Sequence, residues 1–263
     1  MRKFAKRLGF LVISMTLILG AACHQAIAHD LWLEVRDYTP EVDDDITFTL
    51  GYGHYLPARE FMDKKDLEEI YILDQKGNKV GIKSYSDVEF KIDKPLKKKG
   101  TYLIAAKKKG GFFTKTTEGY KRGQTKKGLK NVIKCTYSEK CSKAIVNAGK
   151  AGGKIFSEIL GHDLEILPLA DPGALAQGDY LPIKVIFKGK PLSSTHVFAT
   201  YVGFSTEKNT FAYATKTSKE GIAKIKMLKS GVWLITTYHI YAYPNPKECD
   251  QYKLTSSLTF EIR

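Results

Sequence analysis

Short stretches in which apolar and polar residues alternate recur along most of the chain after residue 28. In residues 45–52, Ile46, Phe48 and Leu50 alternate with threonines, and a period of two residues is typical of a half-buried β-strand. Similar patterns predict further strands over 31–35, 69–73, 88–92 and 101–106. We therefore expect residues 29–110 to form a small antiparallel β-sandwich domain.

A second block of predicted strands fills residues 161–263. Turn sequences such as Asp171-Pro172-Gly173 separate its apolar runs. The predicted strands cover 164–169, 180–187, 196–201, 211–214, 222–227, 232–238 and 258–262. Because no alternation of strands with helices is visible, this block is expected to form a second β-sandwich.

Residues 111–160 differ from both blocks. They are rich in Lys, Gly and Thr at first, and residues 143–149 then resemble a short helix. We interpret 111–160 as an elaborated connection. The expected fold class is all-β: two β-sandwich domains joined by a Lys-rich, partly helical connection.

The first 28 residues have the three parts of a secretory signal. Four basic residues come first, an apolar run follows over 8–19, and Ala26-Ile27-Ala28 has the small residues of a cleavage site. The mature chain is then expected to begin at His29 in the periplasm. Cleavage before Cys23, with lipid anchoring, is the less favoured alternative because Gly20 stands where lipoprotein signals usually carry leucine. No other stretch is long enough to span a membrane.

Charge and cysteine content indicate which partners and which disulfides to expect. The chain has 42 basic and 28 acidic residues, a formal charge of +14, and removal of residues 1–28 leaves +10. The lysine runs at 97–99, 107–109 and 121–130 lie near glycines and are interpreted as solvated loops, so no nucleic-acid partner is expected. Cys135, Cys141 and Cys249 predict one disulfide, whose pairing the sequence leaves open.

Known catalytic motifs are missing from the sequence. It contains no Gly-x-Ser-x-Gly elbow, phosphate loop, His-Glu-x-x-His helix or Cys-x-x-Cys pair. We therefore expect no enzymatic activity. Trp32, Trp233 and the tyrosines are expected to fill cores rather than to stack on a carbohydrate.

Histidine placement gives the strongest indication of chemistry. A terminal His29 would offer an α-amine and an imidazole, both easily deprotonated near neutral pH. His54 lies in a glycine-flanked turn and His239 lies on a predicted strand or at its end. We predict that His29, His54 and His239 bind a transition metal, whereas His162 and His196 are interpreted as structural.

Several short motifs resemble those of DUF4198-type periplasmic proteins, which are described as components of nickel or cobalt uptake systems. They include Ala28-His29-Asp30-Leu31-Trp32-Leu33-Glu34, Gly53-His54 with Pro57, Gly161 to Leu169, Gly178-Asp179, Gly189 to Leu192, Gly231-Val232-Trp233 and Ser257 to Ile262. The resemblance spans nearly the whole mature chain except the Lys-rich segment and the cysteines. It implies immunoglobulin- or transthyretin-like sandwiches, the second similar to carboxypeptidase-regulatory domains.

The resemblance also implies that the protein captures Ni²⁺ or Co²⁺, with Cu²⁺ or Zn²⁺ as alternatives, and delivers it to an inner-membrane permease. It places His29 and His54 in matching motifs, whereas His239 rests on the strand pattern alone. Two rival functions remain. One is a copper histidine-brace oxidase that acts on polysaccharide, and the other is a metal-free adhesion or binding sandwich.

Overall fold

The computed structural model describes residues 29–57, 60 and 62–263, so the predicted signal sequence lies outside the described residues. The strands of the first half are β1 (Asp30–Val35), β2 (Thr47–Gly53), β3 (Leu67–Leu73), β4 (Lys79–Val80), β5 (Ile82–Ser84), β6 (Glu89–Ile92), β7 (Gly100–Thr116), β8 (Gly119–Arg122) and β9 (Val132–Ala148). Those of the second half are β10 (Leu164–Pro168), β11 (Tyr180–Phe187), β12 (Lys190–Pro191), β13 (His196–Tyr201), β14 (Tyr213–Lys216), β15 (Ile222–Lys226), β16 (Gly231–Ala242) and β17 (Gln251–Ile262). Helical turns of three residues each are η1 (Lys64–Asp66), η2 (Ile155–Ser157) and η3 (Pro172–Ala174).

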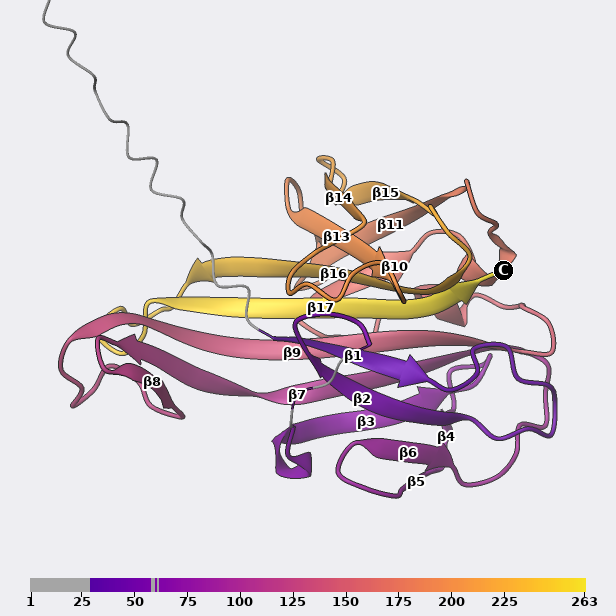
Figure 1. Ribbon diagram of the computed structural model, residues 1–263, viewed down its shortest axis with the longest axis horizontal. Coiled ribbons are helices and arrows are strands. Elements are labelled where there is room, and N and C mark those ends of the chain that lie inside the picture. Colours follow the sequence, from indigo (N-terminus) through magenta and orange to yellow (C-terminus); the bar gives the residue numbers. More distant parts are fainter. Residues whose placement is uncertain (1–28, 58–59, 61) are drawn as a thin grey trace, which may run out of the picture.

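These strands form three sheets, the largest of which lies between the other two (Figure 1). The central sheet has nine strands in the order β14-β13-β16-β17-β9-β7-β3-β4, with β8 paired to β7. One outer sheet has the order β1-β2-β6-β5, and the other has β10-β11-β12 with β15 paired to β11. The prediction of an all-β sandwich protein is confirmed.

Each outer sheet encloses its own hydrophobic core against the central sheet. Leu31 and Phe48 of the first outer sheet pack with Ile104 and Val146 of the central sheet. On the other face, the second outer sheet packs against central residues that include Trp233. The central sheet, which contains strands from both predicted blocks and from residues 111–160, supplies one wall of both cores.

The C-terminal strand β17 joins the two halves of the chain within the central sheet. It pairs antiparallel with β16 and parallel with β9, so that Gln251 lies opposite Thr136. Residues 140–148 of β9 and 253–260 of β17 are buried, and small polar side chains occupy much of this buried surface. Ser257 Oγ donates to the Leu31 carbonyl at 2.5 Å, which satisfies one of these buried groups.

The helix that the sequence predicted over residues 143–149 is absent. Residues 111–160 form the end of β7, the whole of β8 and the whole of β9, followed by the helical turn η2, and residues 143–148 continue β9. Long strands buried on both faces lack a simple alternation of apolar and polar residues, and this explains the misreading. The lysine run 107–109 likewise lies within β7 instead of a loop.

The disulfide joins Cys135 of β9 to Cys249, just before β17, and Cys141 is a buried free thiol. This resolves the pairing that the sequence left open. Among the described residues, no helix has the length and apolar character needed to cross a membrane.

Candidate metal centre

Two of the histidines that the sequence singled out meet where β1 begins and β2 ends. The antiparallel register pairs Asp30 with Gly53, so the residues one step beyond this pair, His29 and His54, lie beside each other. Their ring centroids are 4.3 Å apart and their ring planes are tilted by 40°. The strand pairing itself therefore creates this histidine pair.

A carboxylate that the sequence analysis did not single out completes the group. Glu60 lies in the segment after β2, and its backbone N–H donates to the Tyr52 carbonyl at 2.6 Å. Glu60 Oε2 contacts His29 Nε2, and Glu60 Oε1 lies 3.8 Å from His54 Nε2. One ligand atom from each of the three side chains lies within 4.8 Å of the others. The sequence signal for Glu60 is only an acidic residue six positions after His54, which is weak.

Neighbouring groups hold the two rings in place. The Tyr52 ring stacks on His29, with centroids 4.8 Å apart and planes within 4° of parallel. The His54 carbonyl accepts a hydrogen bond of 3.0 Å from the backbone N–H of Asn209, which belongs to the second half of the chain. His54 Nδ1 is buried and has no hydrogen-bond partner among the described residues. The pair is thus fixed by elements from both halves.

The electrostatics of the cluster favour neutral imidazole next to ionised carboxylate. Burial lowers the pKa of His29, and the nearby His54 and Lys140 act in the same direction, whereas the hydrogen bond to Glu60 opposes them. The hydrogen bond from His29 lowers the pKa of the Glu60 carboxyl. Neutral histidine and ionised glutamate are the forms that bind metals.

A buried charged group lies behind the cluster on the same side of the central sheet. The Asp30 side chain is buried, which raises its pKa, and Lys140 and Lys253 oppose this rise. Burial lowers the pKa of Lys140 to about 8, although Asp30 acts in the opposite direction. Lys140 Nζ also donates to Ser138 Oγ at 3.1 Å. These groups place positive charge behind β1.

The third predicted ligand, His239, lies on the other face of the central sheet. Side chains alternate along β16, so Leu234 packs with Trp32 of β1, whereas Ile235 belongs to the core against the second outer sheet. His239 shares the face of Ile235, and its ring centroid lies 4.6 Å from that of Phe187 in β11. The structure therefore does not bring His239 to His29 and His54.

The other two histidines in the described part of the chain lie apart from this cluster. His196 is exposed on β13 and its ring stacks with Phe198 at a centroid distance of 6.0 Å. His162 is buried just before β10, and both of its ring nitrogens lack a hydrogen-bond partner among the described residues. Burial lowers the pKa of His162, which favours its neutral form.

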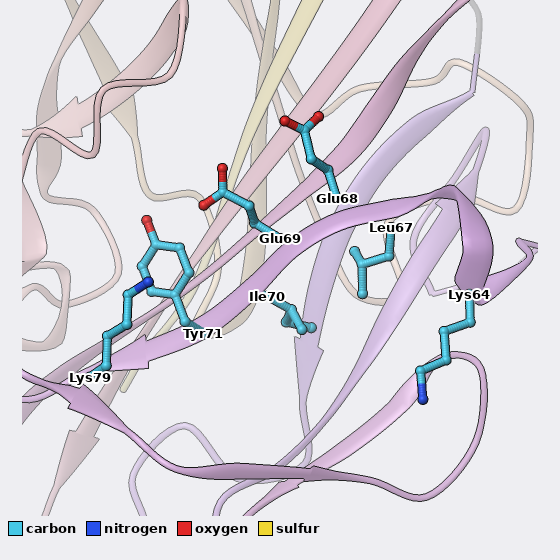
Figure 2. Close-up of a pocket in the computed structure, with 7 residues that line it drawn as sticks. All are labelled: Lys64, Leu67, Glu68, Glu69, Ile70, Tyr71 and Lys79. Atoms are coloured by element: carbon cyan, nitrogen blue, oxygen red, sulfur yellow. The ribbon is translucent and has the colours of Figure 1, made fainter.

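A separate open pocket of about 400 Å³ lies along β3 (Figure 2). Its lining residues are Lys64, Leu67, Glu68, Glu69, Ile70, Tyr71 and Lys79. The Glu68 and Glu69 carboxylates project to the same side because the β3–β7 register shifts between Leu67 and Glu69. Lys107 Nζ lies 3.2 Å from Glu68 Oε1, so this carboxylate is already paired. The pocket contains no histidine and is not the site predicted from the sequence.

Comparison with known proteins identifies the family of this chain. Residues 26–241 match the model of a family described as "Domain of unknown function (DUF4198)". No curated protein matches the chain.

Similar solved structures include the D0-D1 domain of intimin, at 12% identity and a TM-score of 0.22, over 87% of this chain and 97% of that chain. The Escherichia coli adhesin FdeC is 12% identical with a TM-score of 0.24, over 87% of this chain and 62% of that chain. The mouse nectin-like molecule 4 ectodomain is 8% identical with a TM-score of 0.18, over 86% and 97% of the two chains. Overlaps at these TM-scores carry no argument about function.

Proposed function

The chain belongs to the DUF4198 family, and from this premise we propose that the protein binds a divalent transition-metal ion with His29, His54 and Glu60. The observation that carries the proposal is the convergence of two imidazoles and one carboxylate, with ligand atoms within 4.8 Å of one another. Nickel(II) or cobalt(II) is the proposed cargo, with copper(II) and zinc(II) as the alternatives. The protein acts as a carrier, so no covalent bond is made or broken.

The donor set fits such an ion. Nitrogen and oxygen ligands lie about 2.0–2.2 Å from a metal such as zinc, so two donors of one ion are at most about 4.4 Å apart. A small side-chain movement brings the observed group within this limit. The imidazoles favour transition metals over calcium or magnesium, which prefer all-oxygen sites.

The ion would be reached from solvent. The side chains of His29 and Glu60 are 27% and 44% exposed, whereas His54 is 17% exposed and lies deeper. A partly exposed site suits an ion that is captured and then released. Delivery to an inner-membrane permease after export to the periplasm is part of the proposal, and its support is the resemblance of the His29 motif to nickel or cobalt uptake components.

Two modes of binding by His29 make different predictions. In the first, Nε2 of His29 binds the metal beside Glu60, as the observed contact between these groups suggests. In the second, signal cleavage after Ala28 frees the α-amine, which chelates the metal together with Nδ1, and Glu60 accepts a hydrogen bond from Nε2–H. The contact between Glu60 and His29 Nε2 is compatible with both modes, and only the second requires a free amine.

Calorimetric titration of the chain 29–263 with Ni²⁺, Co²⁺, Cu²⁺ and Zn²⁺ tests the proposal. We expect one tight site per chain, and absence of binding tighter than that of scattered surface histidines would refute the proposal and favour a metal-free binding sandwich. A chain with one glycine added before His29 separates the modes. Unchanged affinity supports side-chain binding, whereas a loss of about a hundredfold or more assigns the terminal chelate.

A copper-dependent oxidase is the rival function, because a terminal histidine beside a second histidine is also a copper-binding arrangement. The readout is peroxide formation by the copper-loaded chain with ascorbate. Turnover well above that of a His54→Ala variant would contradict a pure carrier. Release of intact Ni²⁺ or Co²⁺ to a chelator without turnover is the result that the carrier predicts.

A further inference from the structure

The far end of the central sheet carries an unusual concentration of positive charge. Residues 109–134, here named the basic tip, comprise the end of β7, the whole of β8 and the start of β9. The segment has eight basic residues and one acidic residue, Glu118, for a formal charge of +7, whereas residues 29–263 together carry +10. The eight are Lys109, Lys115, Lys121, Arg122, Lys126, Lys127, Lys130 and Lys134.

Little of this charge is neutralised within the protein. Lys126 pairs with Asp250, and the other seven basic residues of the tip form no ion pair with a described residue. By contrast, Lys107 and Lys108, just before the tip, pair with Glu68 and Asp66 at 3.2 Å and 2.9 Å. The tip therefore presents an uncompensated positive field to solvent.

Apolar side chains are exposed among these cations. Tyr120 is 60% exposed and Ile133 is 56% exposed. The β7–β8 register places Tyr120 opposite Lys115, whose Nζ lies 6.0 Å from the centroid of the tyrosine ring. Tyrosine and the long stems of lysine suit the boundary between lipid headgroups and acyl chains, where one end of the side chain is apolar and the other is hydrated.

The tip is accessible and firmly attached. In Figure 1, β7, β8 and β9 extend leftward beyond the two outer sheets. The Cys135–Cys249 disulfide joins the start of β9 to the segment before β17. The backbone N–H of Lys126 also donates to the Glu248 carbonyl at 2.9 Å. A surface presented in this way can approach a flat partner without obstruction from the rest of the molecule.

We propose that the basic tip docks on an anionic lipid bilayer. The lysines and Arg122 would bind headgroup phosphates, and Tyr120 and Ile133 would enter the interface. An isoleucine and a tyrosine exposed among unpaired cations favour a lipid surface over a nucleic acid or an acidic protein, because an anionic bilayer has an apolar layer directly beneath its charged headgroups. This inference is independent of the metal site.

Sedimentation with lipid vesicles tests the docking surface. The chain 29–263 is mixed with vesicles of phosphatidylcholine alone or of phosphatidylcholine with phosphatidylglycerol, at low and high salt. One variant reverses three tip charges (Lys127→Glu, Lys130→Glu and Lys134→Glu). A matched variant reverses three exposed lysines elsewhere (Lys76→Glu, Lys83→Glu and Lys219→Glu). Both variants have the same net charge, so the location of the charge is the only difference.

We expect the wild-type chain to bind the anionic vesicles at low salt, to dissociate from them at high salt, and not to bind vesicles of phosphatidylcholine alone. The tip variant should lose at least about tenfold in binding, whereas the matched variant should retain most of it. A folded Tyr120→Ser, Ile133→Ser double variant should also bind more weakly, at unchanged charge. Equal losses in the two charge variants would overturn the proposal. Failure of the wild-type chain to bind anionic vesicles would also overturn it and would instead indicate an acidic protein as the partner.

Discussion

Lys143 of β9 and Glu165 of β10 form an ion pair that solvent does not reach. Their side chains are 2% and 0% exposed, respectively, and Lys143 Nζ donates to Glu165 Oε2 at 2.5 Å. The backbone N–H groups of Leu160, Gly161 and His162 also donate to this carboxylate, at 2.8–3.0 Å. One buried carboxylate thus joins the central sheet to the loop that leads into the second outer sheet.

Replacement of Lys143 by Met should strongly destabilise the fold, because the Glu165 charge would remain buried without its cation. We expect the free energy of unfolding to fall by about 3–5 kcal/mol, measured by urea denaturation. Lys150→Met, at an exposed position, is the matched control and should change little. A Lys143→Met, Glu165→Gln double variant should recover part of the loss, and a Lys143→Met effect no larger than the control would contradict the role of the pair.

The thiols of the chain 29–263 should react in a pattern that depends on the fold. Cys135 and Cys249 are joined, and burial raises the pKa of the Cys141 thiol to about 12. A thiol reagent should therefore modify almost nothing in the folded protein and one thiol per chain after unfolding without reductant. Three reactive thiols after unfolding would contradict the disulfide, and rapid reaction of the folded chain would contradict the burial of Cys141.

Metal affinity should resist mild acid. Burial lowers the pKa of His29, and His29 lowers the pKa of Glu60, so protons compete for these ligands only below the ordinary histidine pKa of about 6.5. Nickel affinity measured between pH 8 and pH 5 should stay nearly constant down to about 6.5 and fall below it. A decline that begins near pH 8 would instead indicate the terminal amine, whose ordinary pKa is near 7.7–8.0.

The same shift links His29 to stability in the absence of metal. A histidine whose pKa is lowered by folding binds fewer protons in the folded state than in the unfolded state. Its contribution to stability is therefore present above the unfolded pKa, about 6.5, and is lost as the pH falls toward the lowered value. His29→Gln should flatten this part of the curve of unfolding free energy against pH.

Much of the fold could be predicted from local patterns. The alternation in residues 45–52 correctly indicated β2, but strands from both predicted blocks share the central sheet, so Leu73 and Leu103 of the first block belong to the core against the second outer sheet. Residues 132–148 could not be recognised as one long strand, because the strand is solvent-exposed at its start and buried on both faces over residues 140–148. Ser142, Lys143 and Ala144 are all buried although they are polar, charged and apolar, so the alternation of apolar and polar residues is lost.

The candidate site was predictable in part. His29 and His54 were identifiable because each flanks a predicted strand, and the pairing of those strands brings them together. Glu60 depends on how the segment after β2 folds back toward Tyr52, which no short motif encodes. His239 lies on the opposite face of β16, and sequence alone does not tell which face of a strand turns toward a distant residue.

The central claim is that His29, His54 and Glu60 form one metal site. Its most direct test is the nickel affinity of His54→Ala compared with that of His239→Ala, both measured by calorimetry on folded chains that begin at residue 29. We predict a loss of about tenfold to a hundredfold or more for His54→Ala and wild-type affinity for His239→Ala. Unchanged affinity for His54→Ala, or an equal loss for the two variants, would contradict the site.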